Sequence, residues 1–330
     1  MADLTTSYMG LKLRNPIIVS SSDLTGTASR IMRCDEAGAG AVVLKSIFEE
    51  QFKMREDIPE GDYGGHPEAL DYMRGGGLLE YAPQKMCQMI EDVKKKVNIP
   101  VFASINCQSS KLWPRFAHQL QEAGVDGLEL NIYSFPLSLD SPGSEFEEYH
   151  LDILNEVKKV VSIPVSVKLT SHLTSVPFLA NKLAKAGCDA LILFNWFLRS
   201  DINIEKLKTR NLIGKGDFFQ SLKWVALLAG RVDCDIASSG GVHKAEDIIK
   251  QILAGASAVQ ICTLFYRQGL DVIQGLLREV EAWMEKKQYS GIDDFRSELS
   301  FKRQELTFKD FGEADAYFRS QYLKTYSKVK

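Results

Sequence analysis

Short aliphatic runs recur along the chain, and four of them follow the same phrase. In this phrase an amphipathic stretch ends with Ala-Gly, and a run of small or aliphatic residues follows. A glycine just past a helix, followed by such a run, is typical of a helix that ends and a buried strand that begins. The phrase occurs at residues 37–44, 123–130, 186–193 and 254–261.

A second phrase alternates with the first. It opens an aliphatic run with proline at residues 15–20, 99–104 and 163–168, and residues 235–239 repeat it without proline. Proline is tolerated at the first residue of a strand, because the missing N–H is not needed there. The two phrases together predict eight strands. Amphipathic stretches of helical length separate most of them, at residues 83–97, 111–123, 145–161, 175–186 and 244–253.

Eight apolar strands that alternate with helices indicate an α/β fold, and eight is the number that closes a (β/α)8 TIM barrel. An open doubly wound sheet is the alternative, but the paired repeat is more natural in a closed barrel. Two insertions, at 47–81 after strand 2 and at 196–220 after strand 6, follow strand ends, where barrels build active sites. We expect one barrel over residues 1–290 and a helical extension over 291–330 that packs on the barrel or on a dimer partner.

Composition removes several classes of protein. The formal net charge of −3 lacks the basic surplus of a nucleic-acid binder. No stretch approaches the roughly 18 apolar residues of a membrane helix, and the N-terminus does not resemble a signal peptide, so a cytoplasmic location is expected. The six cysteines and five histidines are scattered without metal-ligand spacing, which favours reduced thiols and no metal site.

The residues at the predicted strand ends are polar, rich in amides and cationic. Ser-Gly-Gly after strand 7 and Thr263 after strand 8 suit a phosphate, which (β/α)8 enzymes commonly hold there. Asparagine both donates and accepts, as the edge of a flavin or pyrimidine requires. Lys168 ends strand 5, where its charge would stabilise a developing anion such as the N1–C2=O edge of a reduced flavin. Lys45 stands at the equivalent end of strand 2.

These residues resemble the flavin-dependent dihydroorotate dehydrogenases, particularly the soluble class without a membrane-docking N-terminus. The similarity runs from about Leu4 to Gly291. Each motif is weak alone, and their order along eight strands makes the resemblance specific. The motifs are Asn-Pro-Ile-Ile-Val-Ser-Ser at 15–21, Leu-Lys-Ser at 44–46, Glu-Leu-Asn-Ile at 129–132, Val-Ser-Val-Lys-Leu at 165–169, Ser-Gly-Gly-Val at 239–242 and Gln-Ile-Cys-Thr at 260–263.

The resemblance implies FMN at the barrel mouth and oxidation of dihydroorotate to orotate, a step of pyrimidine biosynthesis. In the family a base on the loop after strand 4 takes a proton from C5, while C6 gives hydride to flavin N5. By matching position, the ring and ribityl chain would lie against Ser21, Ser22, Lys45, Ser46, Ser104, Asn131, Lys168 and Asn195. The lower ribityl chain and phosphate would lie against Gly216, Gly240, Gly241, Cys262 and Thr263.

The loop after strand 4 departs from the family pattern. Where the family reads Asn-x-Ser-Cys/Ser-Pro-Asn, residues 131–136 read Asn-Ile-Tyr-Ser-Phe-Pro. Ungapped alignment puts Ser134 at the position of the base, whereas alignment of the prolines puts Phe135 there and leaves no base, with Tyr133 as the fallback. Two of the four substrate-reading asparagines remain, Asn131 and Asn195, and Arg74 is a candidate to pair with the substrate carboxylate.

The sequence therefore predicts an FMN oxidoreductase with Ser134, Lys168 and Lys45 as catalytic residues. A different dihydropyrimidine or an enoate as substrate is the first alternative. A Schiff-base barrel lyase that uses Lys168, or a non-catalytic flavin- or partner-binding protein, is the alternative of another class. A small-molecule substrate, a homodimer and an electron-transfer partner subunit are expected, and fumarate, NAD through that partner, or quinone stays open as the acceptor.

Overall fold

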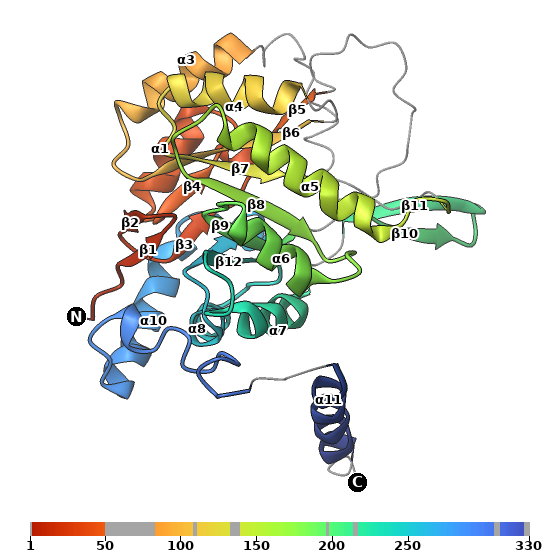
Figure 1. Ribbon diagram of the computed structural model, residues 1–330. Coiled ribbons are helices and arrows are strands. Elements are labelled where there is room, and N and C mark those ends of the chain that lie inside the picture. Colours follow the sequence, from red (N-terminus) through yellow and green to blue (C-terminus); the bar gives the residue numbers. More distant parts are fainter. Residues whose placement is uncertain are drawn as a thin grey trace.

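Eight parallel strands close into a barrel in the computed structural model, which describes residues 2–49, 83–107, 111–132, 139–195, 198–213, 217–306 and 311–326 (Figure 1). Every neighbouring pair is parallel, and the β3–β13 and β4–β6 pairings complete the circle. The predicted (β/α)8 fold is confirmed. The barrel strands are β3 (Ile17–Val19), β4 (Ala41–Val43), β6 (Val101–Asn106), β7 (Gly127–Asn131), β8 (Val165–Thr170), β9 (Ala190–Asn195), β12 (Asp235–Ser239) and β13 (Ala258–Ile261).

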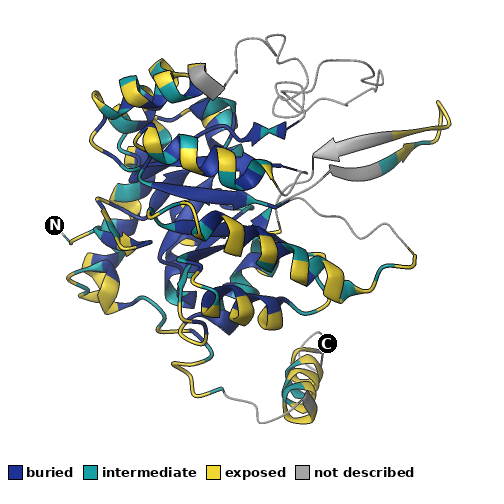
Figure 2. Ribbon diagram, turned by 45° about the horizontal axis from the view of Figure 1, so that its top comes forward, coloured by how far each residue is buried: buried dark blue, intermediate teal, exposed yellow. Residues whose placement is uncertain are grey.

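Helices surround the barrel and bury one face each, so that Figure 2 shows blue strands inside and yellow outer helix faces. The glycines of the first repeated phrase end helices as predicted: Gly38, Gly124, Gly187 and Gly255 all have φ between 88° and 119°. The barrel helices are α1 (Ala28–Glu36), α3 (Pro83–Lys94), α4 (Leu112–Glu122), α5 (Gly143–Lys158), α6 (Val176–Lys185), α7 (Phe218–Leu228), α8 (Ala245–Ala254), the short α9 (Thr263–Gln268) and α10 (Val272–Lys287).

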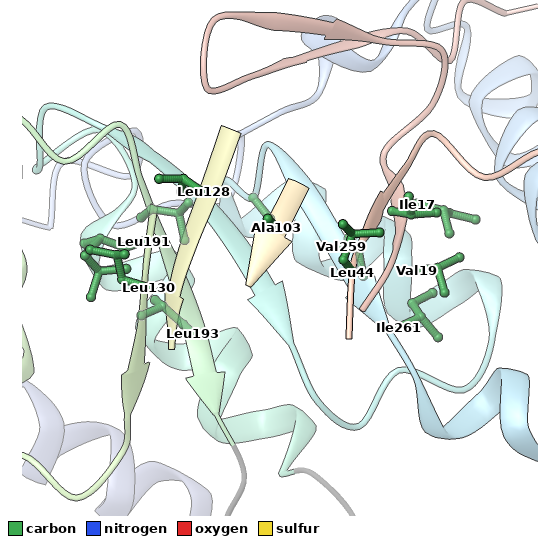
Figure 3. Packing of buried hydrophobic residues seen from close by; sticks show 14 of the residues in the cluster. Ile17, Val19, Leu44, Ala103, Leu128, Leu130, Leu191, Leu193, Val259 and Ile261 are labelled. Carbon is green, nitrogen blue, oxygen red and sulfur yellow. The ribbon is translucent and has the colours of Figure 1, made fainter. Parts of the chain in front are cut away.

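Two apolar layers lie on opposite faces of the strands, because successive side chains of a strand point to opposite sides. The outer layer packs under the helices, and Figure 3 shows its members Leu128, Leu130, Leu191 and Leu193 among others. The inner layer fills the lower barrel. It consists of Ile18, Ala41, Val43, Phe102, Ala190, Ile192, Ala237 and Ala258, together with residues of the N-terminal hairpin.

That hairpin, β1 (Thr6–Tyr8) and β2 (Leu11–Leu13), closes the end of the barrel where the strands begin. Tyr8 is buried and meets the ring of Phe102 edge to face, with 5.8 Å between ring centroids. The backbone N–H of Met9 donates to the carboxylate of Asp235 over 2.7 Å. Because the hairpin closes this end, the open end of the barrel is the one where the strands terminate, which is called the mouth below.

Both insertions contain structure that the sequence did not predict. After strand 2, β5 (Ile47–Phe48) pairs with β6, and residues 50–82 lie outside the described part of the chain. After strand 6, β10 (Leu198–Asn203) and β11 (Lys208–Ile213) form an antiparallel hairpin that extends away from the barrel (Figure 1).

The C-terminal extension begins on the barrel itself. After the 3-10 turn Ile292–Asp294, Phe295 is fully buried, and the backbone N–H of Ser297 donates to the carbonyl of Ile252 in α8. The last helix, α11 (Phe311–Tyr326), places Phe318 on Phe301, with ring centroids 6.1 Å apart. The division at residue 290 stays a prediction. None of the described helices is long and apolar enough to cross a membrane.

Candidate active site at the barrel mouth

A layer of buried polar side chains lies above the inner apolar layer. The hydrogen bond from Gln260 Nε2 to Glu129 Oε2, at 2.6 Å, joins β13 to β7, which are not neighbours in the sheet. A contact between non-neighbouring strands has to cross the barrel interior. The layer is therefore inside the barrel, and its members are buried: Ser20, Lys45, Ser46, Ser104, Glu129, Lys168 and Gln260.

Lys168 lies at the centre of this layer. Its Nζ is 3.0 Å from Oε1 of Gln260 and 3.4 Å from both Oγ of Ser20 and Oε1 of Glu129. The strand explains the position, because Ser166, Lys168 and Thr170 alternate with the valines and leucine of the outer layer on β8. These contacts place the side chain of Lys168 inside the barrel.

Glu129 is the negative partner that the sequence analysis did not identify. It is 1% exposed, and it also accepts a hydrogen bond from Oγ of Ser104 over 3.4 Å. Its strand reads Gly-Leu-Glu-Leu-Asn, in which Leu128 and Leu130 belong to the outer layer and Glu129 therefore faces inward. A charged or amide residue within such an apolar strand of a barrel was the available signal, which also applies to Gln260 in β13.

Three of the predicted cofactor-binding serines form one chain of hydroxyls. Oγ of Ser46 lies 2.9 Å from Oγ of Ser21 and 2.7 Å from Oγ of Ser104. Ser22, also predicted, is buried and donates to the carbonyl of Ser20 over 3.2 Å. Because Ser104 also contacts Glu129, these linked hydroxyls connect the loop after β3 to the Glu129–Lys168 pair.

Lys45 follows β4 and enters the mouth beside the first loop. Its side chain is 7% exposed, and its Nζ lies 3.4 Å from Oδ1 of Asp23. Asp23 also pairs with Arg30 of α1, and its backbone N–H donates to Oη of Tyr266 in α9 over 3.0 Å. Burial raises the pKa of Tyr266 far above its ordinary value, so the phenol stays protonated. Asp23 was not predicted, because a lone aspartate in a loop carries no periodic signal.

The two asparagines that were predicted to bind substrate, Asn131 and Asn195, form a hydrogen bond with each other. Nδ2 of Asn195, at the end of β9, donates to Oδ1 of Asn131, at the end of β7. The intervening strand β8 pairs Lys168 with Asn131 on one side. The amide pair therefore lies over the strand that carries Lys168, and it presents donor and acceptor atoms together.

The loops after β12 and β13 carry the residues that the sequence analysis predicts for a phosphate. Gly240 and Gly241 follow β12 with φ of 95° and 75°, in the left-handed region that favours glycine. Cys262 precedes α9, whose first residue is Thr263. Ser134, Arg74 and Gly216, which complete the predicted set, lie outside the described residues.

The comparisons with known proteins all indicate the same family. The family model described as dihydroorotate dehydrogenase matches residues 3–284. The dihydroorotate dehydrogenase B (NAD(+)) catalytic subunit of Thermoplasma acidophilum is 28% identical over 305 residues, which cover 89% of this chain and 98% of the relative. That of Methanocaldococcus jannaschii is 29% identical over 293 residues, 86% and 94% of the two chains. A putative dihydroorotate dehydrogenase A (fumarate) of Aeropyrum pernix is 28% identical over 304 residues, 89% and 95% of the two chains.

Proposed function

Because the chain belongs to the dihydroorotate dehydrogenase family, we propose that it is an FMN-dependent oxidoreductase that converts dihydroorotate to orotate. The observation that carries the proposal is the buried layer in which Lys168 contacts Glu129, Gln260 and Ser20. Burial of an ion pair costs desolvation free energy that hydrophobic residues of similar volume would not cost. A barrel that keeps such a pair at its mouth is best explained by a ligand that needs it.

The chemistry of the donor set fits FMN. A flavin presents carbonyl oxygens and ring nitrogens along its edge, which ammonium, hydroxyl and amide groups complement. The glycine pair after β12 and the start of α9 stand where (β/α)8 enzymes commonly bind phosphate. The ring would be held by Ser21, Ser22, Lys45, Ser46, Ser104, Asn131, Lys168 and Asn195, and the phosphate end by Gly216, Gly240, Gly241, Cys262 and Thr263.

Lys168 would supply the electrostatic part of the reaction. Bound FMN would accept hydride from C6 of dihydroorotate, a redox capacity that side chains lack. The ammonium of Lys168 would stabilise negative charge that develops at the pyrimidine edge of the ring. Glu129 and Gln260 hold Nζ in place from below, so no reorganisation is needed when that charge appears. Lys45 would provide a second fixed positive charge at the same mouth.

Ser134, Asn131 and Asn195 would handle the substrate. In this proposal Oγ of Ser134 takes the proton from C5 while its own hydroxyl proton passes to a solvent water molecule, because a neutral serine hydroxyl is too weak a base to keep both protons. The amide pair of Asn131 and Asn195 would hydrogen-bond the ring amides of dihydroorotate. Arg74 would pair with the substrate carboxylate through its two parallel N–H donors.

The names of the relatives extend the proposal to a partner. Several are catalytic subunits of an NAD(+)-type dihydroorotate dehydrogenase, a name that implies a further subunit. We include an electron-transfer partner subunit and a homodimer in the proposal. Fumarate is the alternative acceptor, because one relative carries that name.

The sequence of the loop after β7 favours one second candidate, an FMN enzyme that acts on another dihydropyrimidine or on an enoate. Residues 131–136 lack the cysteine of the soluble class and one of its asparagines. A site that hydrogen-bonds its substrate loses selectivity when such an amide is missing. The Schiff-base alternative is disfavoured, because Lys168 is engaged with the Glu129 carboxylate whereas a Schiff-base lysine attacks as a neutral amine.

Titration of the apoprotein with FMN, followed by anaerobic addition of candidate donors, tests the function. We expect saturable FMN binding that Lys168→Met weakens, and bleaching of the flavin by dihydroorotate but not by dihydrouracil or NADH. Lys158→Met is the matched control, because Lys158 pairs with Asp189 near the opposite end of the barrel. Absence of FMN binding would refute the proposal, bleaching only by another donor would select the second candidate, and binding without bleaching would leave a flavin-binding protein.

A further inference from the structure

Asp23 connects three elements around the mouth. It opens the 3-10 turn Asp23–Thr25 that follows β3, and it contacts Lys45 after β4, Arg30 in α1 and Tyr266 in α9. None of the family resemblance rests on this position. Its contacts place it directly behind one of the two lysines that the proposed function assigns to the flavin.

The carboxylate of Asp23 is shared between a buried cation and a rim cation. Oδ1 lies 3.4 Å from Nζ of Lys45, and Oδ2 pairs with the guanidinium of Arg30. The three side chains are 7% exposed for Lys45, 23% for Asp23 and 46% for Arg30. The ion pair with Lys45 is therefore the more shielded of the two, and solvent weakens it less.

Main-chain contacts hold Asp23 independently of its carboxylate. Its N–H donates to Oη of Tyr266 over 3.0 Å, and its carbonyl accepts from Nη1 of Arg30 over 2.8 Å. Tyr266 belongs to the helix that begins at Thr263. Because these contacts do not involve the side-chain oxygens, replacement of Asp23 by asparagine keeps the loop and removes only the charge.

We propose that Asp23 is a positioning residue that holds the ammonium of Lys45 at the flavin site. This inference rests on the proposed function. A lysine has a flexible four-carbon stem, and a fixed anion beside it reduces the number of positions that the charge samples. The 3.4 Å contact between Oδ1 and Nζ places that anion on the lysine that the proposed function assigns to the flavin. Preorganisation of this kind improves binding by lowering the ordering cost.

A double-mutant cycle on FMN affinity tests the inference. The apoprotein and the variants Asp23→Asn, Lys45→Met and the double variant are titrated with FMN by fluorescence. We expect Asp23→Asn to weaken FMN binding about fivefold when Lys45 is present, and to change it by less than about twofold when residue 45 is methionine. A purely structural role of Asp23 would weaken binding equally in both backgrounds, and that result would overturn the proposal.

Three further variants keep the test decisive. Asp35→Asn is the matched control, because Asp35 of α1 pairs with Arg14 away from the mouth, and it should leave FMN affinity unchanged. If Asp23→Asn does not fold, Asp23→Glu and Asp23→Gln replace it, since they differ from each other mainly in charge. The glutamate variant should bind FMN more tightly than the glutamine variant, and equal affinities would refute the proposal. If the unaltered protein binds no FMN, the proposed function fails instead.

Discussion

Oε1 of Glu129 lies 3.4 Å from Nζ of Lys168, and both side chains are almost fully enclosed in the barrel. The residues come from the adjacent strands β7 and β8, whose register pairs Glu129 with Ser166 and Asn131 with Lys168. The backbone of Glu129 therefore lies one layer below that of Asn131, and the backbone of Lys168 lies level with Asn131. The carboxylate of Glu129 balances the buried charge of Lys168 inside the barrel.

Removal of one partner of this pair should destabilise the protein. Glu129→Gln keeps the shape and leaves Lys168 as an uncompensated buried charge, so we expect a loss of about 3 kcal/mol in the free energy of unfolding. The double variant Glu129→Gln with Lys168→Met should recover most of that loss. Urea denaturation of the apoprotein measures both values.

The control for that prediction is Glu156→Gln. Glu156 pairs with Lys159 on the solvent side of α5, where the two side chains are 50% and 65% exposed. An exposed pair contributes about 0.5 kcal/mol or less. A Glu129 variant that lost no more stability than the Glu156 variant would contradict the assignment of a buried charged pair.

Gly40 should tolerate no side chain. It precedes β4, and a Cβ at this position would lie 2.0 Å from the backbone oxygen of Asn15. Because the clash is with backbone, no change of a side-chain rotamer can relieve it. We expect Gly40→Ala to cost about 2–3 kcal/mol in thermal or urea unfolding. Gly275→Ala in α10 is the comparison, because a Cβ there would come no nearer than 4.0 Å to a side-chain nitrogen, that of Arg278. It should stabilise the protein by up to about 1 kcal/mol, and similar effects of the two changes would refute the packing argument.

His150 should make the protein less stable in acid. It is fully buried in α5, and burial lowers the pKa of its imidazole below the ordinary value of 6.5. Below pH 6.5 the unfolded chain binds a proton that the folded protein does not, so the free energy of unfolding falls as pH falls, by at most about 1.4 kcal/mol per pH unit.

Urea denaturation between pH 7 and pH 5 measures this dependence. His150→Gln should flatten it in that range, whereas the exposed His118→Gln should leave the slope of the unaltered protein. An equal slope in the His150 variant would show that other groups cause the acid sensitivity.

The amide pair offers a prediction about the substrate. Asn195→Ala removes the donor to Asn131 and one proposed contact with the dihydroorotate ring. We expect KM for dihydroorotate to rise about tenfold or more, because a polar group of the bound substrate loses its partner. The unfolding free energy should change little, because both asparagines are only partly buried. Steady-state kinetics with an artificial electron acceptor measures KM, and an unchanged KM would remove Asn195 from the substrate site.

The barrel could be predicted from the sequence because the same strand and helix signals repeat four times. The helix-ending glycines were identified from the Ala-Gly phrase, and the prolines of the second phrase stand directly before β3, β6 and β8. Pro16 and Pro100 accept hydrogen bonds through their carbonyls from neighbouring strands, which needs no N–H. Local rules of this kind do not depend on contacts between distant parts of the chain.

Residues of the candidate site could be predicted only where they follow an apolar run and so stand at the end of a strand. Lys168 and Lys45 stand out after apolar runs, whereas the partners Glu129, Gln260 and Asp23 come from other strands or loops. Those pairings depend on barrel closure and register, which the sequence pattern does not encode residue by residue. The hairpin β10–β11 was missed for a similar reason, since its alternating polar strand reads as part of an insertion.

Anaerobic mixing of the FMN-loaded protein with dihydroorotate, followed by visible absorbance, shows whether this barrel oxidises dihydroorotate. We expect the flavin band to bleach, Lys168→Met to slow bleaching at least about tenfold, and Ser134→Ala to slow it as well. A flavin that stays oxidised at saturating dihydroorotate would contradict the claim that this barrel oxidises dihydroorotate.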